Sequence, residues 1–183
     1  AYPQDVTPAM VLNFLSGGAA INVLAKHAGA HIVVLDAGVA ADLPSDSALR
    51  SVKMGRGTAN IAIGPAMTTE QAVKCLEIGI EACQEQIDEG TDLLACGDMG
   101  IGNTTPSSAI ISVITGADPN LTTGRGTGID DATLVHKAAV VRRAIEVNRP
   151  DPKDGLDVLA KVGGFEIGVL AGVMLGAAAG QRP

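Results

Sequence analysis

The sequence predicts an α/β fold in which a parallel sheet is flanked by helices. Two short apolar runs, His31–Asp36 and Thr91–Cys96, have the composition of buried parallel strands. Segments with helical periodicity lie between and after these runs, and clusters of Gly, Pro and Ser mark the turns. Such alternation is typical of α/β proteins. We therefore expect a Rossmann-like, three-layer arrangement.

In the first half of the chain, the clearest element is a helix over residues 68–89. Thr68 and Gln71 form a capping box at its start, and Gly90 follows its end. Its expected inner face repeats every three or four residues: Ala72, Leu76, Ile80, Cys83 and Ile87. Residues 7–26 predict a helix broken at Gly17–Gly18. Residues 39–67 predict mostly loop, with room for a short strand near Thr58–Ile63.

The second half predicts a series of helices joined by loops. Helices are expected at about 105–115, from Asp130 or Asp131 to about 148, at 153–161 and at 165–180, with a loop over 116–128. The inner face of the second of these helices is Leu134, Ala138, Val141 and Ile145. At 183 residues, the chain is long enough for one domain, and we expect residues 1–183 to form a single core.

Charge and composition exclude several classes of protein. With 20 acidic and 13 basic residues, the net charge of −7 argues against a nucleic-acid partner. Three cysteines without a CxxC pair predict neither a disulfide framework nor a zinc site, so no metal site is expected. The cysteine usage favours a reducing compartment. The first six residues do not resemble a signal peptide, and the uncharged apolar stretch Ile167–Gly180 is shorter than the roughly 20 residues that span a bilayer. We expect a cytoplasmic protein without a membrane partner.

The strongest candidate site is the segment GDMGIGNTT, residues 97–105, which we call the first loop. It leaves a predicted strand and enters a predicted helix, where open α/β sheets bind ligands. Its glycines allow backbone N–H groups to approach an anion, and Asn and Thr add donors at the helix N-terminus. The alternative is an ordinary capped turn. Its candidate binding residues are Asp98, Met99, Gly100, Gly102, Asn103, Thr104 and Thr105.

A second glycine-rich segment, GRGTG at residues 124–128, is called the second loop. Its candidate residues are Gly124, Arg125, Gly126 and Thr127, and the alternative is a flexible surface loop. Two such loops in one domain favour a shared ligand. Lys137 lies in the helix that follows. A helix lysine is usually solvated, so its spacing favours a solvated position, and phosphate binding is the alternative.

A third glycine-rich segment is VGGFEIG, residues 162–168. Glu166 lies in the first turn of the helix that follows, where the helix dipole favours a carboxylate, and a functional role is equally open. Gly168, Gly172, Gly176 and Gly180 repeat every four residues and predict close helix–helix packing, in the core or at a subunit interface.

Taken together, these segments resemble the nicotinate-nucleotide:dimethylbenzimidazole phosphoribosyltransferases of cobalamin lower-ligand synthesis. The resembling stretches are FLSGGAAINVLAKHAG, GTANIAIGPAMT, ACGDMGIGNTT, GRGTGID and VGGFEIGVLAGVMLGAA, in the family's order. The resemblance implies a glycosyltransferase that moves a phosphoribosyl group from nicotinate mononucleotide to 5,6-dimethylbenzimidazole, giving α-ribazole 5′-phosphate and nicotinate. It implies no cofactor and a homodimer.

The resemblance also implies residue roles. The first loop would hold the phosphate and ribose, Met99 would line the benzimidazole pocket, and Gly124 to Thr127 with Lys137 would bind phosphate. Asp98 stands where the family commonly has Glu. The aspartate keeps the negative charge, but its side chain is shorter, so its carboxylate reaches less far.

Family members are roughly twice as long as this chain. The family's catalytic glutamate lies in a GEGTGA-like segment, so the general base is expected beyond Pro183 and the 183 residues alone are expected to be inactive. Two alternatives remain: a module that only binds a phosphorylated ligand, and a related transferase that uses a different base.

Overall fold

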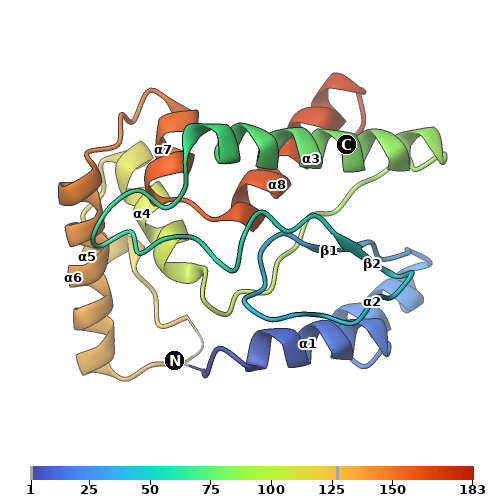
Figure 1. Ribbon diagram of the computed structural model, residues 1–183, viewed down its shortest axis with the longest axis horizontal. Helices are drawn as coiled ribbons and strands as arrows, with labels where there is room; N and C mark the ends of the chain where they lie inside the picture. Colours follow the sequence, from blue (N-terminus) through green and yellow to red (C-terminus); the bar gives the residue numbers. More distant parts are fainter. Residues whose placement is uncertain (1, 127) are drawn as a thin grey trace. The chain divides into compact units, whose positions relative to one another are not determined.

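The computed structural model describes residues 2–126 and 128–183 and divides into two compact units, residues 2–57 and 58–183. The smaller unit contains helices α1 (Val6–Leu15) and α2 (Ala20–Ala28) and strands β1 (Val34–Asp36) and β2 (Leu49–Ser51). The larger unit is helical, with α3 (Thr69–Asp88), α4 (Thr104–Thr115), α5 (Pro119–Thr122), α6 (Asp131–Asn148), α7 (Gly155–Val162) and α8 (Phe165–Ala179) (Figure 1).

The α/β class is confirmed, whereas the predicted three-layer sheet is not shown. Strands β1 and β2 pair in parallel, with Val34 opposite Leu49 and Asp36 opposite Ser51. Strand β1 occupies the end of the predicted run 31–36, and β2 lies inside the predicted loop 39–67. Within the described residues this is the only sheet. The strand expected at 58–63 is instead a turn, in which Asn60 Oδ1 accepts the Ala62 N–H at 3.0 Å.

The strand predicted at residues 91–96 is also wrong for this structure. The segment carries no strand assignment, although the Leu94 N–H donates to the Pro183 carbonyl at 3.0 Å. Leu93 remains 70% exposed. An apolar run forms a strand only when another strand supplies backbone partners, and among the described residues no neighbouring strand pairs with it.

A buried carboxylate organises the loop after β1. Asp36 is almost fully buried, and its Oδ1 accepts the N–H groups of Gly38 and Val39 at 3.1 and 2.8 Å. The ammonium group of Lys53 lies 3.1 Å from Asp36 Oδ2 and donates to the Val39 and Ala41 carbonyls at 2.7 Å each. Because every one of these contacts is within the smaller unit, we interpret the pair as structural.

The N-terminal segment contains an apolar stretch longer than Ile167–Gly180. Val6–Ala28 spans 23 residues with a mean hydropathy of 1.4, which satisfies a membrane-span test by length and composition. The structure divides it into α1 and α2, of 10 and 9 residues, as expected from the break at Gly17. Each helix is therefore about 15 Å long, half of a bilayer core.

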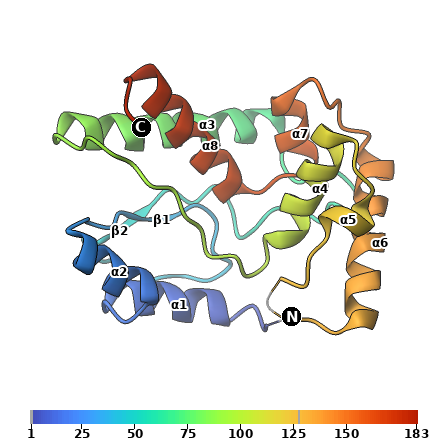
Figure 2. The ribbon, with the colours of Figure 1, turned by 180° about the vertical axis from the view of Figure 1, so that it is seen from behind.

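Helices α3 and α8 pack side by side through glycine (Figures 1 and 2). A Cβ at Gly79 would lie 2.0 Å from the Val169 carbonyl oxygen, and one at Gly172 would lie 2.1 Å from the Leu76 carbonyl oxygen. The predicted glycine stripe thus packs against α3 of the same chain. The buried face of α3 also differs from the predicted one. Gly79 packs on α8 and is buried, whereas Ile80, which was expected inside, is 40% exposed.

The remaining helices agree with the predicted boundaries to within a few residues. Thr68 and Gln71 form the capping box of α3, and Asp130 caps α6 by accepting the Thr133 N–H. Helix α5 lies in the segment predicted as a loop; it is a single turn whose N-cap is Asp118. Helix α4 contacts α5, α6 and α7 within the larger unit (Figure 2).

Candidate anion-binding site

The first loop leads into the N-terminus of α4 with its helical donors uncapped. Asn103 is the N-cap residue, yet its side chain makes no capping hydrogen bond. Gly102 has φ +91°, a left-handed conformation that glycine adopts without strain and that turns the chain into the helix. The first-turn N–H groups of Thr104 and Thr105 carry the positive end of the helix dipole, which favours an anion.

Lys137 connects the first loop to the second. Its ammonium group donates to Thr104 Oγ1 at 2.7 Å and to the Gly124 carbonyl at 3.3 Å. The side chain is half-buried, and this burial lowers the pKa of the ammonium group. The solvated helix position favoured by spacing is therefore wrong. Lys137 lies three residues after Leu134 and four before Val141, so it borders the packed face of α6.

The second loop approaches the same point. Gly126 has φ +54°, and a Cβ there would lie 3.2 Å from Thr104 Oγ1 and 3.4 Å from Lys137 Nζ. Both the backbone conformation and the space therefore favour glycine. The two glycine-rich segments that the sequence singled out thus meet at one lysine, which has no carboxylate among its described hydrogen-bond and ion-pair partners.

One predicted residue of the second loop, Arg125, is not brought into this arrangement. The guanidinium group of Arg125 pairs with Asp131 and donates to the Ile129 carbonyl at 3.0 Å, so it is directed toward the start of α6. Thr127 lies outside the described residues. Lys137 and the N-terminus of α4 are therefore the positive groups that the structure places together.

Asp98 and Asn103 form the other side of the first loop. The Asn103 amide donates to Asp98 Oδ2, and Asn103 is only 7% exposed. Glu166, in the first turn of α8, also interacts with the Asn103 side chain. Burial raises the pKa of Glu166, and the charge of Asp98 raises it further, against the lowering effect of the hydrogen bonds of the carboxyl.

The remaining candidates of the first loop are placed without a specific polar role. Met99 and Gly100 are half-buried before the helix, and Thr105 is half-buried in its first turn. A Cβ at Gly100 would lie 3.8 Å from Asn103 Oδ1, which is ordinary contact. The positions of these residues in the sequence did not distinguish them from Thr104. In the structure only the Thr104 hydroxyl among them accepts a hydrogen bond from the Lys137 ammonium group.

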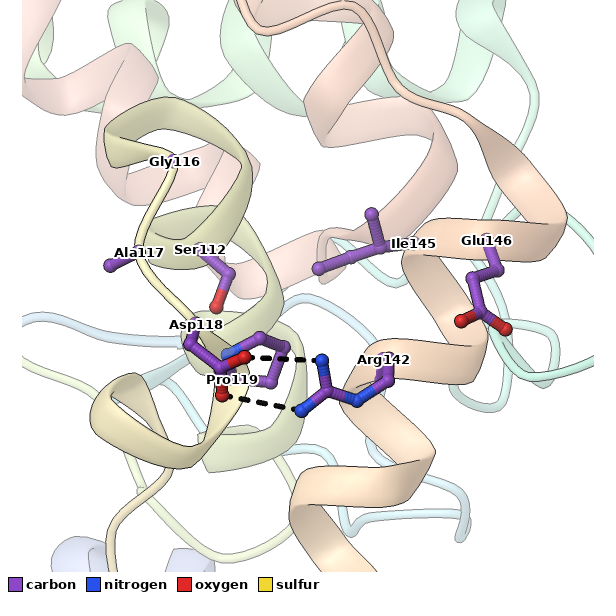
Figure 3. Close-up of a pocket in the computed structure, with 8 residues that line it drawn as sticks. All are labelled: Ser112, Gly116, Ala117, Asp118, Pro119, Arg142, Ile145 and Glu146. Atoms are coloured by element: carbon purple, nitrogen blue, oxygen red, sulfur yellow. Dashed lines mark hydrogen bonds and ion pairs between the residues drawn. The ribbon is translucent and has the colours of Figure 1, made fainter.

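A cavity of about 310 Å³ lies at the opposite end of α4 (Figure 3). Asp118 and Arg142 form a two-bond ion pair beside it, with both nitrogen–oxygen distances 3.2 Å. Asp118 Oδ1 also accepts the Asn120 N–H that caps α5. These hydrogen bonds lower the pKa of Asp118. Because the charges already satisfy each other, we interpret the pair as a brace between α5 and α6.

The described residues contain no cluster of three or more His, Cys, Asp or Glu side chains arranged to hold a metal ion. The three cysteines are free thiols; Cys75 and Cys83 are buried and Cys96 is exposed. Burial, with a contribution from the nearby Glu166 charge, raises the pKa of Cys75 to about 11.

Comparisons with known proteins agree over the whole chain. The model of a family described as Phosphoribosyltransferase matches residues 1–183. The nicotinate-nucleotide–dimethylbenzimidazole phosphoribosyltransferase of Roseiflexus sp. (strain RS-1) is 61% identical over all of this chain and 52% of that protein. The protein of the same name from Chloroflexus aggregans is 59% identical over the same shares.

Solved structures agree as well. The crystal structure of CobT from Thermus thermophilus superposes with a TM-score of 0.94 at 47% identity, covering 100% of this chain and 55% of that one. The chain spans about half the length of the curated relatives it matches.

Proposed function

Since the chain belongs to the phosphoribosyltransferase family, whose model matches it from end to end, we propose that the site at Lys137 binds the phosphate of nicotinate mononucleotide. One observation carries the proposal: the Lys137 ammonium group spans both glycine-rich loops, 2.7 Å from Thr104 Oγ1 and 3.3 Å from the Gly124 carbonyl. A phosphate there would meet a cation and the uncapped N–H groups of α4 together. Relatives 59–61% identical carry the substrate's name.

The proposed reaction is transfer of the phosphoribosyl group to 5,6-dimethylbenzimidazole. A ring nitrogen of the benzimidazole attacks the anomeric carbon on the face opposite nicotinate, and the configuration inverts. The glycosidic bond breaks with its electron pair on the nicotinate nitrogen, and the benzimidazole N–H proton passes to a general base. The products are α-ribazole 5′-phosphate and nicotinate.

The residues of this chain are assigned to positioning the donor. Asp98, which is exposed beside the loop, would face the ribose as positive charge develops on it, and Met99 would line the benzimidazole pocket. Arg125 and Thr127 would complete the phosphate site; Arg125 would first have to leave Asp131. The general base is assigned to a part of the enzyme outside these 183 residues, so the chain alone would bind without turnover.

We further propose that the 183 residues are the nucleotide-binding core of a longer cytoplasmic enzyme. In that enzyme residues 91–96 would form one strand of a wider, Rossmann-like parallel sheet flanked by helices, which accounts for the exposed Leu93 in an apolar run. Met174 and Leu175, 59% and 54% exposed on α8, are candidates for a homodimer contact. Sedimentation of the longer enzyme as a monomer would overturn the homodimer.

Titration calorimetry tests the binding proposal. We expect the chain to bind nicotinate mononucleotide and to bind nicotinate riboside, which lacks the phosphate, about ten- to a hundred-fold more weakly, as the loss of a charged hydrogen-bonding group implies. Equal affinity for the two would contradict a phosphate site. Binding of phosphate esters without preference for the nucleotide would instead favour a general phosphorylated-ligand module.

Activity is tested separately, by incubating the chain with nicotinate mononucleotide and 5,6-dimethylbenzimidazole and measuring α-ribazole 5′-phosphate by chromatography. We expect no product. Product formation would show that the general base lies within these residues, whereas product with another benzimidazole or purine alone would favour a transferase with a different base.

A further inference from the structure

Arg125 is the only charged residue of the second loop, and its guanidinium group is bound to the start of α6. It donates to the Ile129 carbonyl at 3.0 Å and forms an ion pair with Asp131. Asp131 is the first residue of α6 and has no role in the proposed function. The proposed phosphate site therefore has a second cation beside it, which the structure leaves on a carboxylate of the protein.

The position of the second loop is held by backbone bonds and does not depend on this side chain. The carbonyl oxygen of Arg125 accepts the N–H groups of Gly128 and Ile129 at 3.1 and 3.2 Å, which closes the turn. Before the turn, the Gly124 carbonyl accepts the Lys137 ammonium group at 3.3 Å. The guanidinium group can therefore change partners while the loop stays in place.

The backbone of Arg125 passes beside the Lys137 ammonium group. Its neighbour on one side, Gly124, accepts that group at 3.3 Å, and a Cβ at Gly126 on the other side would lie 3.4 Å from Lys137 Nζ. Rotation about the bonds of the Arg125 side chain can thus carry the guanidinium group from Asp131 to a phosphate bound at Lys137.

The ion pair with Asp131 is of a kind that a phosphate can replace. The Arg125 and Asp131 side chains are 54% and 88% exposed, and exposed ion pairs contribute little to stability. A phosphate carries up to two negative charges and binds a guanidinium group through two parallel hydrogen bonds. Asp131 is also not needed as the cap of α6, because Asp130 accepts the Thr133 N–H at 2.8 Å.

We propose that Asp131 is a competing carboxylate that sets the affinity of the phosphate site. Without nucleotide it holds Arg125 at the start of α6, and on binding Arg125 exchanges Asp131 for the phosphate. A ligand carboxylate would offer Arg125 no more than Asp131 already does, so the exchange favours the more highly charged phosphate. The inference rests on the proposed function, which assigns the phosphate to Lys137.

The experiment measures affinities of the 183-residue chain for nicotinate mononucleotide and for nicotinate riboside by calorimetry. Asp131→Asn removes the charge at nearly constant size, whereas Asp131→Glu keeps a carboxylate. Glu70→Gln, which removes an exposed carboxylate from the first turn of α3, is the matched control. Arg125→Gln is made alone and together with Asp131→Asn, because this double-mutant cycle separates the release of Arg125 from the loss of a nearby negative charge.

We expect Asp131→Asn to bind the mononucleotide about two- to five-fold more tightly than the wild-type chain, as release from an exposed ion pair implies, and to bind the riboside unchanged. Arg125→Gln should bind the mononucleotide about five- to fifty-fold more weakly, because it loses a charged hydrogen bond and only an exposed ion pair is given up for it. In the Arg125→Gln background, Asp131→Asn should have no further effect. Asp131→Glu and Glu70→Gln should match the wild-type chain.

Unchanged or weaker binding by Asp131→Asn would overturn the inference, and weaker binding would show that the ion pair positions the loop. A gain that persists in the Arg125→Gln background would overturn it as well, because the gain would then come from charge alone. The two proposals fail in different ways. If the wild-type chain prefers the mononucleotide and Asp131→Asn changes nothing, only the inference fails; if neither chain binds the mononucleotide, both fail.

Discussion

Gly172→Ala tests the packing of α8 on α3. The added Cβ would lie 2.1 Å from the Leu76 carbonyl oxygen and 2.9 Å from its carbon. Both are backbone atoms, so no side-chain rotation relieves the overlap, and the helices must separate by about 1 Å to restore ordinary contact. Overpacking of this kind costs about 1–3 kcal/mol or somewhat more, and we expect about 3 kcal/mol here.

The loss is measured by thermal and urea unfolding followed by circular dichroism. For a chain of this size, about 3 kcal/mol corresponds to a fall of roughly 6–12 °C in Tm. Gly155→Ala is the matched control, because Gly155 also lies in a helix and an added Cβ there meets no atom within 4 Å. It should leave stability unchanged or raise it slightly. Equal stabilities of the two variants would refute the packing of α8 on α3.

Three further predictions concern groups outside that contact. Thiol modification at pH 8 should label Cys96 and spare the buried Cys75 and Cys83 until the chain is unfolded; native labelling of Cys75 would contradict its raised pKa. Asp36→Asn should destabilise the chain by about 2–3 kcal/mol in urea, because it leaves the Lys53 ammonium group without its carboxylate, and an unchanged midpoint would show that the pair is dispensable. Asp118→Asn should reduce stability at neutral pH, because the folded-state pKa of Asp118 is lowered and the charged carboxylate stabilises the fold. This difference should begin to shrink as the pH falls below about 4, the pKa of an unfolded aspartate, and should vanish only below the lower folded-state pKa. A pH-independent difference would contradict the ion pair with Arg142.

The sequence predicted best what is decided within one turn of helix. The capping box of Thr68 and Gln71, the Asp130 cap and the break at Gly17 are all local, and each appears as expected. The sheet was predicted less well, because pairing depends on residues far apart in the chain. Strand β2 has no apolar alternation to mark it, and the apolar run 91–96 has no strand beside it to pair with among the described residues.

In the candidate site, too, the local features could be predicted from the sequence and the long-range contact could not. The two glycine-rich loops were visible as segments, but their meeting depends on a contact between Lys137 and Thr104, which lie 33 residues apart. Spacing along α6 cannot show that contact. Glu166 was equally ambiguous, since a carboxylate in a first helical turn has an ordinary explanation. The Gly163–Gly164 pair directly before Glu166 was the feature of the sequence that could have indicated close packing around its carboxyl.

The central claim is that Lys137 joins the two loops into one phosphate site, and the affinity of Lys137→Met for nicotinate mononucleotide tests it most directly. Lys153→Met, at an exposed lysine before α7, is the control. We predict about ten- to a hundred-fold weaker binding by Lys137→Met, with its preference for the nucleotide over nicotinate riboside largely lost, and wild-type binding by Lys153→Met. Wild-type affinity and an undiminished phosphate preference in Lys137→Met would contradict the claim.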